Sequence, residues 1–211
     1  MNNTTFDRTS LRLSSILMVT GQVLYIVVTL FHAGGEANNH HAIFAAYADS
    51  RIWTAVHVAQ FGCMAIFLAG LYALFFALEV QAGLARWAGR FGAALAAVTL
   101  ALYGGVLAVD GVALKQAANA WTRAPEAEKT ARFATAEAIR WLEWGMRSYQ
   151  NFTLGLAVLL FAAAVLRTPW TPRPTAYLVG LSGLTYLVRA GSPAPRDSRV
   201  LTRSQSCRQR S

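Results

Sequence analysis

The sequence contains few charged residues and very few cysteines. Charged residues make up only 14% of its 211 residues, against about 25% in a typical soluble domain. Two cysteines, Cys63 and Cys207, form no CxxC pair and are too few for a disulfide scaffold. The hydrophobic residues, 55% of the chain, fall in long blocks, which excludes a disordered or collagen-like chain. This composition indicates an integral membrane protein.

Several apolar blocks have the length that a membrane span needs, which is roughly 20 residues for a hydrocarbon core of about 30 Å. Four long blocks and a shorter fifth occupy residues 13–31, 52–78, 87–112, 141–166 and 176–188. The first is longer than the apolar region of a signal peptide, about 7–15 residues, and we interpret it as a retained span. The sequence therefore predicts an all-α polytopic transmembrane bundle over residues 1–190, with four spans and a short fifth.

Two further segments are more polar. Residues 125–140 begin with a proline and two glutamates, which favour a helix N-terminus. Alanines recur there at helical spacing, which predicts an amphipathic helix that either lies on the membrane surface or extends the fourth span into water. Residues 191–211 are rich in serine, arginine and proline, and predict a disordered basic tail.

The distribution of basic residues predicts the partners and the orientation. The net charge is +9, and charge of this kind usually faces anionic lipid headgroups. We expect no nucleic-acid partner, because no basic face is interleaved with aromatic residues. The arginines that flank alternate span ends are Arg8, Arg12, Arg86, Arg90, Arg167 and Arg173. The positive-inside rule places them and the N-terminus on the cytoplasmic side of the membrane. The basic tail conflicts with this orientation if the fifth block crosses the membrane.

In this topology, ionisable residues at the ends of four spans all lie toward the outer leaflet of the membrane. They are His32, His57, Asp110, Glu143 and Arg147. Such groups are costly at membrane depth and normally face the protein interior or a water-filled cavity. We therefore predict an outward-facing polar pocket that binds a small ligand or ion. The predicted ligand-binding residues are Trp53, His57, Gln60, Asp110, Glu143, Trp144 and Arg147, with Trp141 and Tyr149 as further aromatic wall residues.

Other interpretations remain open. His32 and His57 could ligate a metal ion, with Asp110 or Glu143 as a third ligand, or could clamp a haem, although the sequence has no HxxxH, HExxH or CxxCH motif. A membrane enzyme with Glu143 or His57 as general base is another interpretation, but only Ser148 stands nearby as a nucleophile. The chain could also be a non-catalytic partner subunit or a homo-oligomer. Each residue also has a purely structural explanation, such as an i,i+4 ion pair between Glu143 and Arg147.

Three stretches resemble a group of bacterial membrane proteins. They are AIFAAYADSRIWTAVHVAQF, VDGVALKQA and EAIRWLEWGMRSYQNFTLGLA. They look like those of small multi-pass integral membrane proteins, common in actinobacteria, whose function is unknown. The resemblance covers roughly residues 10–190 and implies a bacterial inner-membrane helical bundle. It transfers no activity, cofactor or catalytic residue to this chain. Such proteins continue into a sixth apolar helix where this chain has SPAPRDSRVLTRSQSCRQRS, and we hypothesise a truncation or reading-frame change there.

Overall fold

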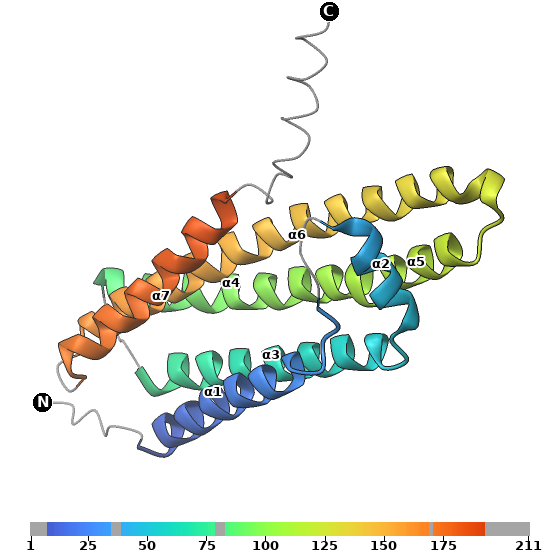
Figure 1. Ribbon diagram of the computed structural model, residues 1–211. Helices are drawn as coiled ribbons and strands as arrows, with labels where there is room; N and C mark the ends of the chain where they lie inside the picture. Colours follow the sequence, from blue (N-terminus) through green and yellow to red (C-terminus); the bar gives the residue numbers. More distant parts are fainter. Residues whose placement is uncertain (1–7, 35–38, 79–82, 169–170, 193–211) are drawn as a thin grey trace, which may run out of the picture.

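The protein is an all-α helical bundle, as the sequence predicts. The computed structural model describes residues 8–34, 39–78, 83–168 and 171–192, and all regular structure in these ranges is helical. The elements are α1 (Arg8–Thr29), α2 (His40–Asp49), α3 (Trp53–Leu78), α4 (Gly83–Ala108), the π-helix η1 (Val109–Leu114), α5 (Lys115–Thr122), α6 (Glu126–Leu166) and α7 (Arg173–Gly191) (Figure 1). The predicted tail over 193–211 lies outside the described residues.

Four helices are long and apolar enough to cross a membrane. They are Arg8–Thr29, Trp53–Leu78, Gly83–Thr122 and Glu126–Leu166. The third comprises α4, η1 and α5 without a break. The fifth predicted block lies within α7, which has 19 residues and is not among these four. The fold is therefore compatible with an integral membrane protein of four spans, with α7 as an additional helix.

The helices pack as two groups. α1 lies along α3, while α6 lies between α4 and α7, and a smaller α3–α4 contact joins the groups. The buried Ser14 hydroxyl of α1 donates to the carbonyl oxygen of Gly70 in α3 at 2.8 Å. Between α6 and α7, a Cβ on Gly155 would lie 2.9 Å from the carbonyl oxygen of Gly183. Small residues allow this close backbone approach in lipid.

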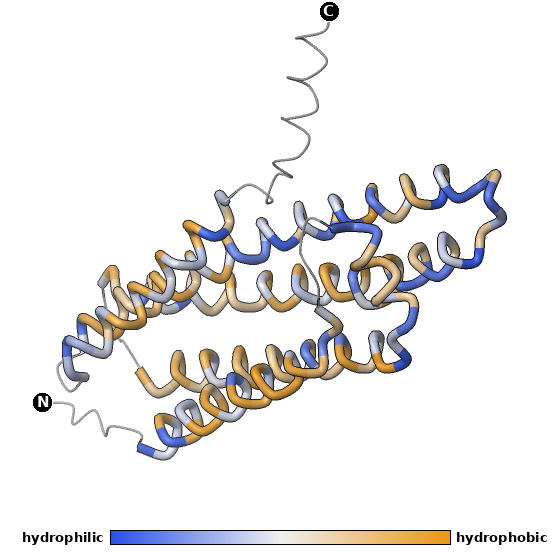
Figure 2. The backbone as a smooth tube through the Cα atoms, in the orientation of Figure 1, coloured by the Kyte–Doolittle hydropathy of each residue, from blue (hydrophilic) through white to orange (hydrophobic). Residues whose placement is uncertain are grey.

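α6 is much longer than a membrane is thick. Its 41 residues span about 60 Å at 1.5 Å per residue, twice the hydrocarbon core. The predicted amphipathic segment 125–140 is almost entirely the first part of this helix, and it extends the span rather than lying apart from it. Figure 2 shows hydrophilic residues concentrated there and at the α5–α6 connection.

A small helical cap covers this end of the bundle. Residues 40–49, which lie between the first two predicted spans, form α2, and this helix packs on α5. An apolar cluster at this end of the bundle holds α2 and α5 together. Its buried residues are Ile43, Phe44, Tyr47, Trp53, Leu114, Ala118 and Ala136. Lys115 fixes the end of α2, since its ammonium donates to the carbonyl oxygens of Tyr47, Ala48 and Ser50 at 2.6–2.8 Å. A cation is favourable at the negative end of a helix.

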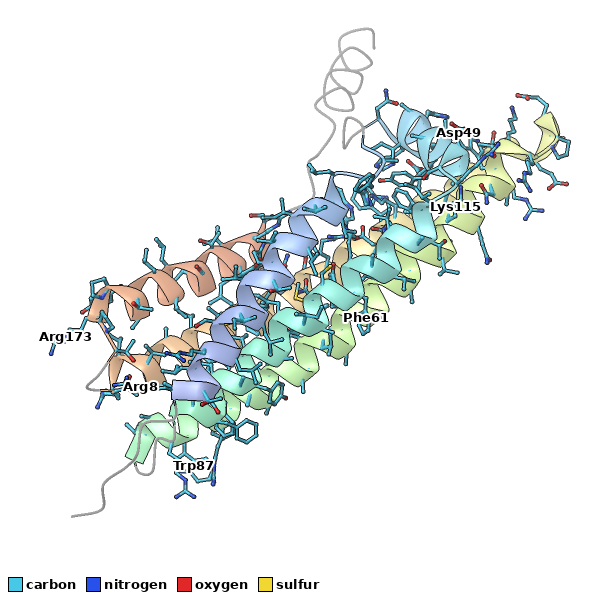
Figure 3. The ribbon with its side chains drawn as sticks, turned by 90° about the horizontal axis from the view of Figure 1, so that it is seen from below. Arg8, Asp49, Phe61, Trp87, Lys115 and Arg173 are labelled. Atoms are coloured by element: carbon cyan, nitrogen blue, oxygen red, sulfur yellow. The ribbon has the colours of Figure 1, made fainter. Side chains whose placement is uncertain are left out.

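The arginines that flank the predicted cytoplasmic span ends lie at the opposite end from the cap. Figure 3 labels Arg8, Trp87 and Arg173 at one end of the bundle and Asp49 and Lys115 at the other. The start of α1, the end of α3, the start of α4, the end of α6 and the start of α7 all lie at this end (Figure 1). The span-flanking arginines therefore lie at one end of the bundle. The cap, and the buried ionisable residues described below, lie toward the other end.

A candidate polar site at the capped end

Four charged side chains form a network between η1 and α6, in which the two carboxylates are buried and the two arginines are partly exposed. Glu143 is fully buried and accepts from Arg147, and from Nη1 of Arg140 at 3.2 Å. Nη2 of Arg147 also donates to Oδ2 of Asp110 at 3.3 Å, and Asp110 is only 2% exposed. Two guanidinium groups therefore balance two carboxylates, which is the form in which buried charges are tolerated.

The π-helix positions Asp110 toward α3. Such widened turns often occur at functional sites. The carbonyl oxygen of Asp110 accepts from Nε1 of Trp53 at 2.9 Å, and that of Gly111 accepts from the Thr54 hydroxyl at 2.8 Å. These bonds tie the first turn of α3 to η1, so the Asp110 side chain is held between α3 and α6.

His57 lies against this carboxylate in a defined tautomer. Its Nδ1 lies 2.8 Å from the carbonyl oxygen of Trp53, and because a carbonyl can only accept, Nδ1 carries a proton. Its Nε2 lies 3.3 Å from Oδ2 of Asp110, but in a direction that makes no hydrogen bond, so this buried atom lacks a hydrogen-bond partner among the described residues.

Aromatic rings enclose the histidines. The His32 ring lies 4.6 Å from that of Trp53 and 5.1 Å from that of His57, and Tyr47 lies 3.9 Å from Trp53 between centroids. Burial lowers the pKa of His32, with the nearby His57 as a second cause. Burial also raises the pKa of Tyr47 to about 12. Both side chains are therefore neutral near pH 7.

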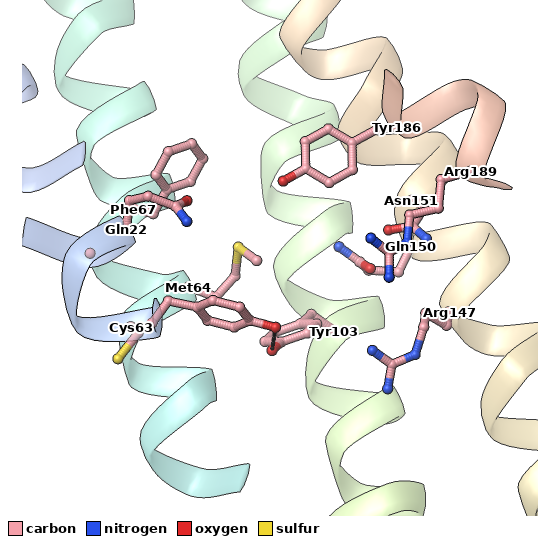
Figure 4. Close-up of a pocket in the computed structure, with 12 residues that line it drawn as sticks. Gln22, Cys63, Met64, Phe67, Tyr103, Arg147, Gln150, Asn151, Tyr186 and Arg189 are labelled. Carbon is pink, nitrogen blue, oxygen red and sulfur yellow. Dashed lines mark hydrogen bonds between the residues drawn. The ribbon is translucent and has the colours of Figure 1, made fainter. Parts of the chain in front are cut away.

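A cavity of about 1010 Å³ adjoins this cluster. Residues of all the helices except α5, and of the segment after α1, line it, among them Tyr25, His32, Asp110, Arg140, Trp144 and Arg189. A smaller pocket of about 140 Å³ lies beside it, deeper in the bundle. Figure 4 shows Arg147, Gln150, Asn151 and Arg189 on one side of that pocket and Gln22, Cys63 and Met64 on the other.

The structure brings most of the predicted site residues together. Gln60, Asp110, Glu143, Trp144 and Arg147 line the larger cavity, as do His32 and Trp141. Ser148 also lines it, although its hydroxyl donates to the Trp144 carbonyl oxygen at 3.2 Å. Their roles as ligand-binding residues stay predictions.

Two aromatic residues differ from the sequence-based expectation. Trp53 was expected in the pocket wall at a membrane edge, but it is 1% exposed and packs behind His32 and His57. Tyr149 was also expected in the wall, but it is 71% exposed. Tyr149 follows the Glu143–Arg147 stripe by two residues, which on a helix is roughly the opposite face.

Two arginines that line the cavity were not among the predicted site residues. Arg140 pairs with Glu143, and its guanidinium carbon lies 5.2 Å from the Trp144 ring centroid. The i,i+3 spacing of Arg140 and Glu143 could have indicated this pair. Arg189 lines both cavities, and it reaches them because α7 packs along α6, which no local pattern indicates.

The histidine geometry bears on the cofactor alternatives. A haem clamped by two axial histidines needs the two imidazoles on opposite faces of the macrocycle. The His32 and His57 rings lie against each other, 5.1 Å between centroids, so no macrocycle fits between them here. A single metal ion needs less space between the two rings than a haem does.

The chain matches no protein-family model, no curated protein and no solved structure.

Proposed function

We propose that this protein is an integral membrane protein that binds a small molecule with an anionic group in the larger cavity. The observation that carries this proposal is Arg189, an arginine that lines the cavity and has no carboxylate within ion-pair distance among residues 8–34, 39–78, 83–168 and 171–192. The other two cavity arginines, Arg140 and Arg147, are already paired with Asp110 and Glu143.

The walls of the cavity suit a ligand with an aromatic or aliphatic body. Tyrosines and tryptophans line it together with hydroxyl and amide groups, namely Tyr25, Tyr47, Tyr103, Trp141, Trp144, Thr29, Ser148, Gln60 and Asn151. Small-molecule sites combine such apolar surface with a few placed polar groups, in volumes of about 300–1,000 Å³. A carboxylate or phosphate would pair with Arg189 while its apolar part contacts the rings.

We also propose that the cavity faces outward. The short basic connections lie at the opposite end of the bundle (Figure 3), and the positive-inside rule favours that end for the cytoplasm. A bacterial inner membrane then has the α2 cap and the cavity on its outer side. The likeness to small multi-pass actinobacterial membrane proteins agrees with this location and stays part of the proposal.

The binding proposal can be tested by thermal shift of the purified full chain against a panel of aliphatic and aromatic carboxylates and phosphates. A ligand at 100 times its Kd stabilises the folded state by about 2.7 kcal/mol. Arg189→Gln should abolish the shift, whereas Arg173→Gln, at the other end of α7, should retain it. A panel that never shifts the wild type, or shifts Arg189→Gln equally, would contradict the proposal.

A further inference from the structure

Three potential metal ligands converge beside the larger cavity, and two of them, His32 and Asp110, lie in its wall. One donor atom each from His32, His57 and Asp110 can be chosen so that all three lie within 4.8 Å of one another. They come from three separate elements, the segment after α1, helix α3 and the π-helix η1. We propose that these residues bind a divalent first-row transition-metal ion.

His57 is oriented as a metal ligand would be. Metal-bound histidines almost always donate their other ring N–H to a carboxylate, a carbonyl or water. Nδ1 of His57 donates to the Trp53 carbonyl oxygen, so Nε2 keeps a free lone pair close to the Asp110 carboxylate. His57 is 2% exposed and Nε2 has no hydrogen-bond partner in the described chain. A metal ion bound at Nε2 would give this buried nitrogen the partner that it lacks.

One carboxylate oxygen of Asp110, Oδ1, is available to bind a metal ion. Arg147 holds Oδ2, but Oδ1 is buried without a hydrogen-bond partner among the described residues. The nearest cation to Oδ1 is Nη1 of Arg140, at 3.9 Å. A buried carboxylate oxygen without a hydrogen-bond partner destabilises the folded protein. Coordination of an ion would satisfy both this oxygen and Nε2 of His57.

His32 completes the set from the cavity side. It lines the cavity and follows the end of α1, where the chain is no longer helical. A metal–nitrogen distance of about 2.1 Å implies neighbouring donors about 3.4 Å apart in a tetrahedral site. The donors need to close by about 1–1.5 Å, which side-chain rotation of His32 can supply.

The donor set indicates the class of ion. Two imidazoles and one carboxylate suit zinc, iron, cobalt or manganese, and three protein ligands leave positions open for water or a ligand. Those positions face the cavity, because His32 and Asp110 lie in its wall. With neutral imidazoles the nearby charges balance, so a divalent ion adds positive charge that an anion from the cavity would offset. Metal binding by the triad nevertheless does not rest on the proposed anionic ligand.

The test is a metal titration of the full chain in detergent, stripped with a chelator and without added carboxylate or phosphate ligands. We expect one Co²⁺ per chain, seen as visible absorption bands, and its displacement by Zn²⁺. His32→Ala and His57→Ala should each weaken binding at least about 100-fold, by extension from the 10–100-fold losses seen for supporting residues alone. His41→Ala is the matched control, because His41 stacks on Phe133 at 4.0 Å, away from the triad, and it should bind like the wild type.

Two variants distinguish misfolding of the protein from the loss of a metal-binding side chain. His32 lies at the rim, so His32→Ala should elute as a monodisperse species and unfold at the wild-type temperature while losing Co²⁺. Arg189→Gln should bind Co²⁺ normally, which distinguishes this site from the anion site. Absence of stoichiometric Co²⁺ and Zn²⁺ binding by the folded wild type, or equal binding by His32→Ala and His57→Ala, would overturn the proposal.

Discussion

Gly111 and His57 approach so closely that a side chain at residue 111 cannot be accommodated. A Cβ there would lie 2.6 Å from the Cβ and 2.9 Å from the Cγ of His57. The contact is between η1 and α3, at the point where Trp53 and Thr54 donate to the η1 carbonyls. The absence of a side chain at residue 111 therefore allows the imidazole to reach Asp110.

Gly111→Ala should separate η1 from α3 and destabilise the protein by about 1–3 kcal/mol, the usual cost of overpacking. Unfolding in an SDS titration measures this change. The control is Gly62→Ala, since a Cβ on Gly62 meets nothing within 4 Å, and alanine is the better helix former by about 0.5–1 kcal/mol. Equal stabilities for the two variants would show that the close approach is not a constraint.

Loss of the Glu143 charge should be far more damaging than loss of an exposed acid on the same helix. Glu143→Gln leaves Arg140 and Arg147 with Asp110 alone. Breaking a fully buried pair costs about 3–5 kcal/mol, and the partial exposure of Arg147 lowers the expected loss to about 2–3 kcal/mol. Glu128→Gln removes an exposed pair with Arg132, worth about 0–1 kcal/mol. The SDS titration compares the two directly, and a small loss in Glu143→Gln would mean that water screens the network.

Lys115 should be required for the attachment of α2. Lys115→Met removes three charged hydrogen bonds to the end of that helix, each worth about 1.5–3 kcal/mol although not additive. We expect faster amide hydrogen exchange over residues 40–50, with little change in α1. Lys129→Met is the control, because Lys129 is 44% exposed and pairs with the exposed Glu126. Unchanged exchange in Lys115→Met would contradict the assigned anchor.

The orientation predicts opposite labelling at the two ends of the bundle. In intact bacterial cells, a membrane-impermeant maleimide should label Asp49→Cys but label Arg173→Cys only after permeabilisation. Both are made in a Cys63→Ser, Cys207→Ser background, in which the unsubstituted chain should stay unlabelled. The reverse labelling pattern would place the cavity on the cytoplasmic side.

The membrane-span pattern was readable from the sequence because a bilayer demands a long apolar segment for each crossing. The i,i+4 spacing of Glu143 and Arg147 likewise indicated that both side chains lie on one face of α6. The sequence also predicted that Gln60 of α3 lines the same pocket. Short-range patterns contain no comparable signal for the π-helix at 109–114 or for α2, whose ten residues pack through tertiary contacts. The burial of Trp53 and the position of Arg189 depend on how distant helices meet, so they required the structure.

The charge network links segments that enter the membrane at different times. Asp110 and Arg147 are 37 residues apart in sequence, and during synthesis the α4–η1 segment emerges before α6. Until α6 arrives, Asp110 has neither guanidinium beside it, and an unpaired carboxylate at membrane depth costs at least about 2.5 kcal/mol. Insertion of these two segments is therefore expected to be cooperative, with the later helix retaining the earlier one in the bilayer.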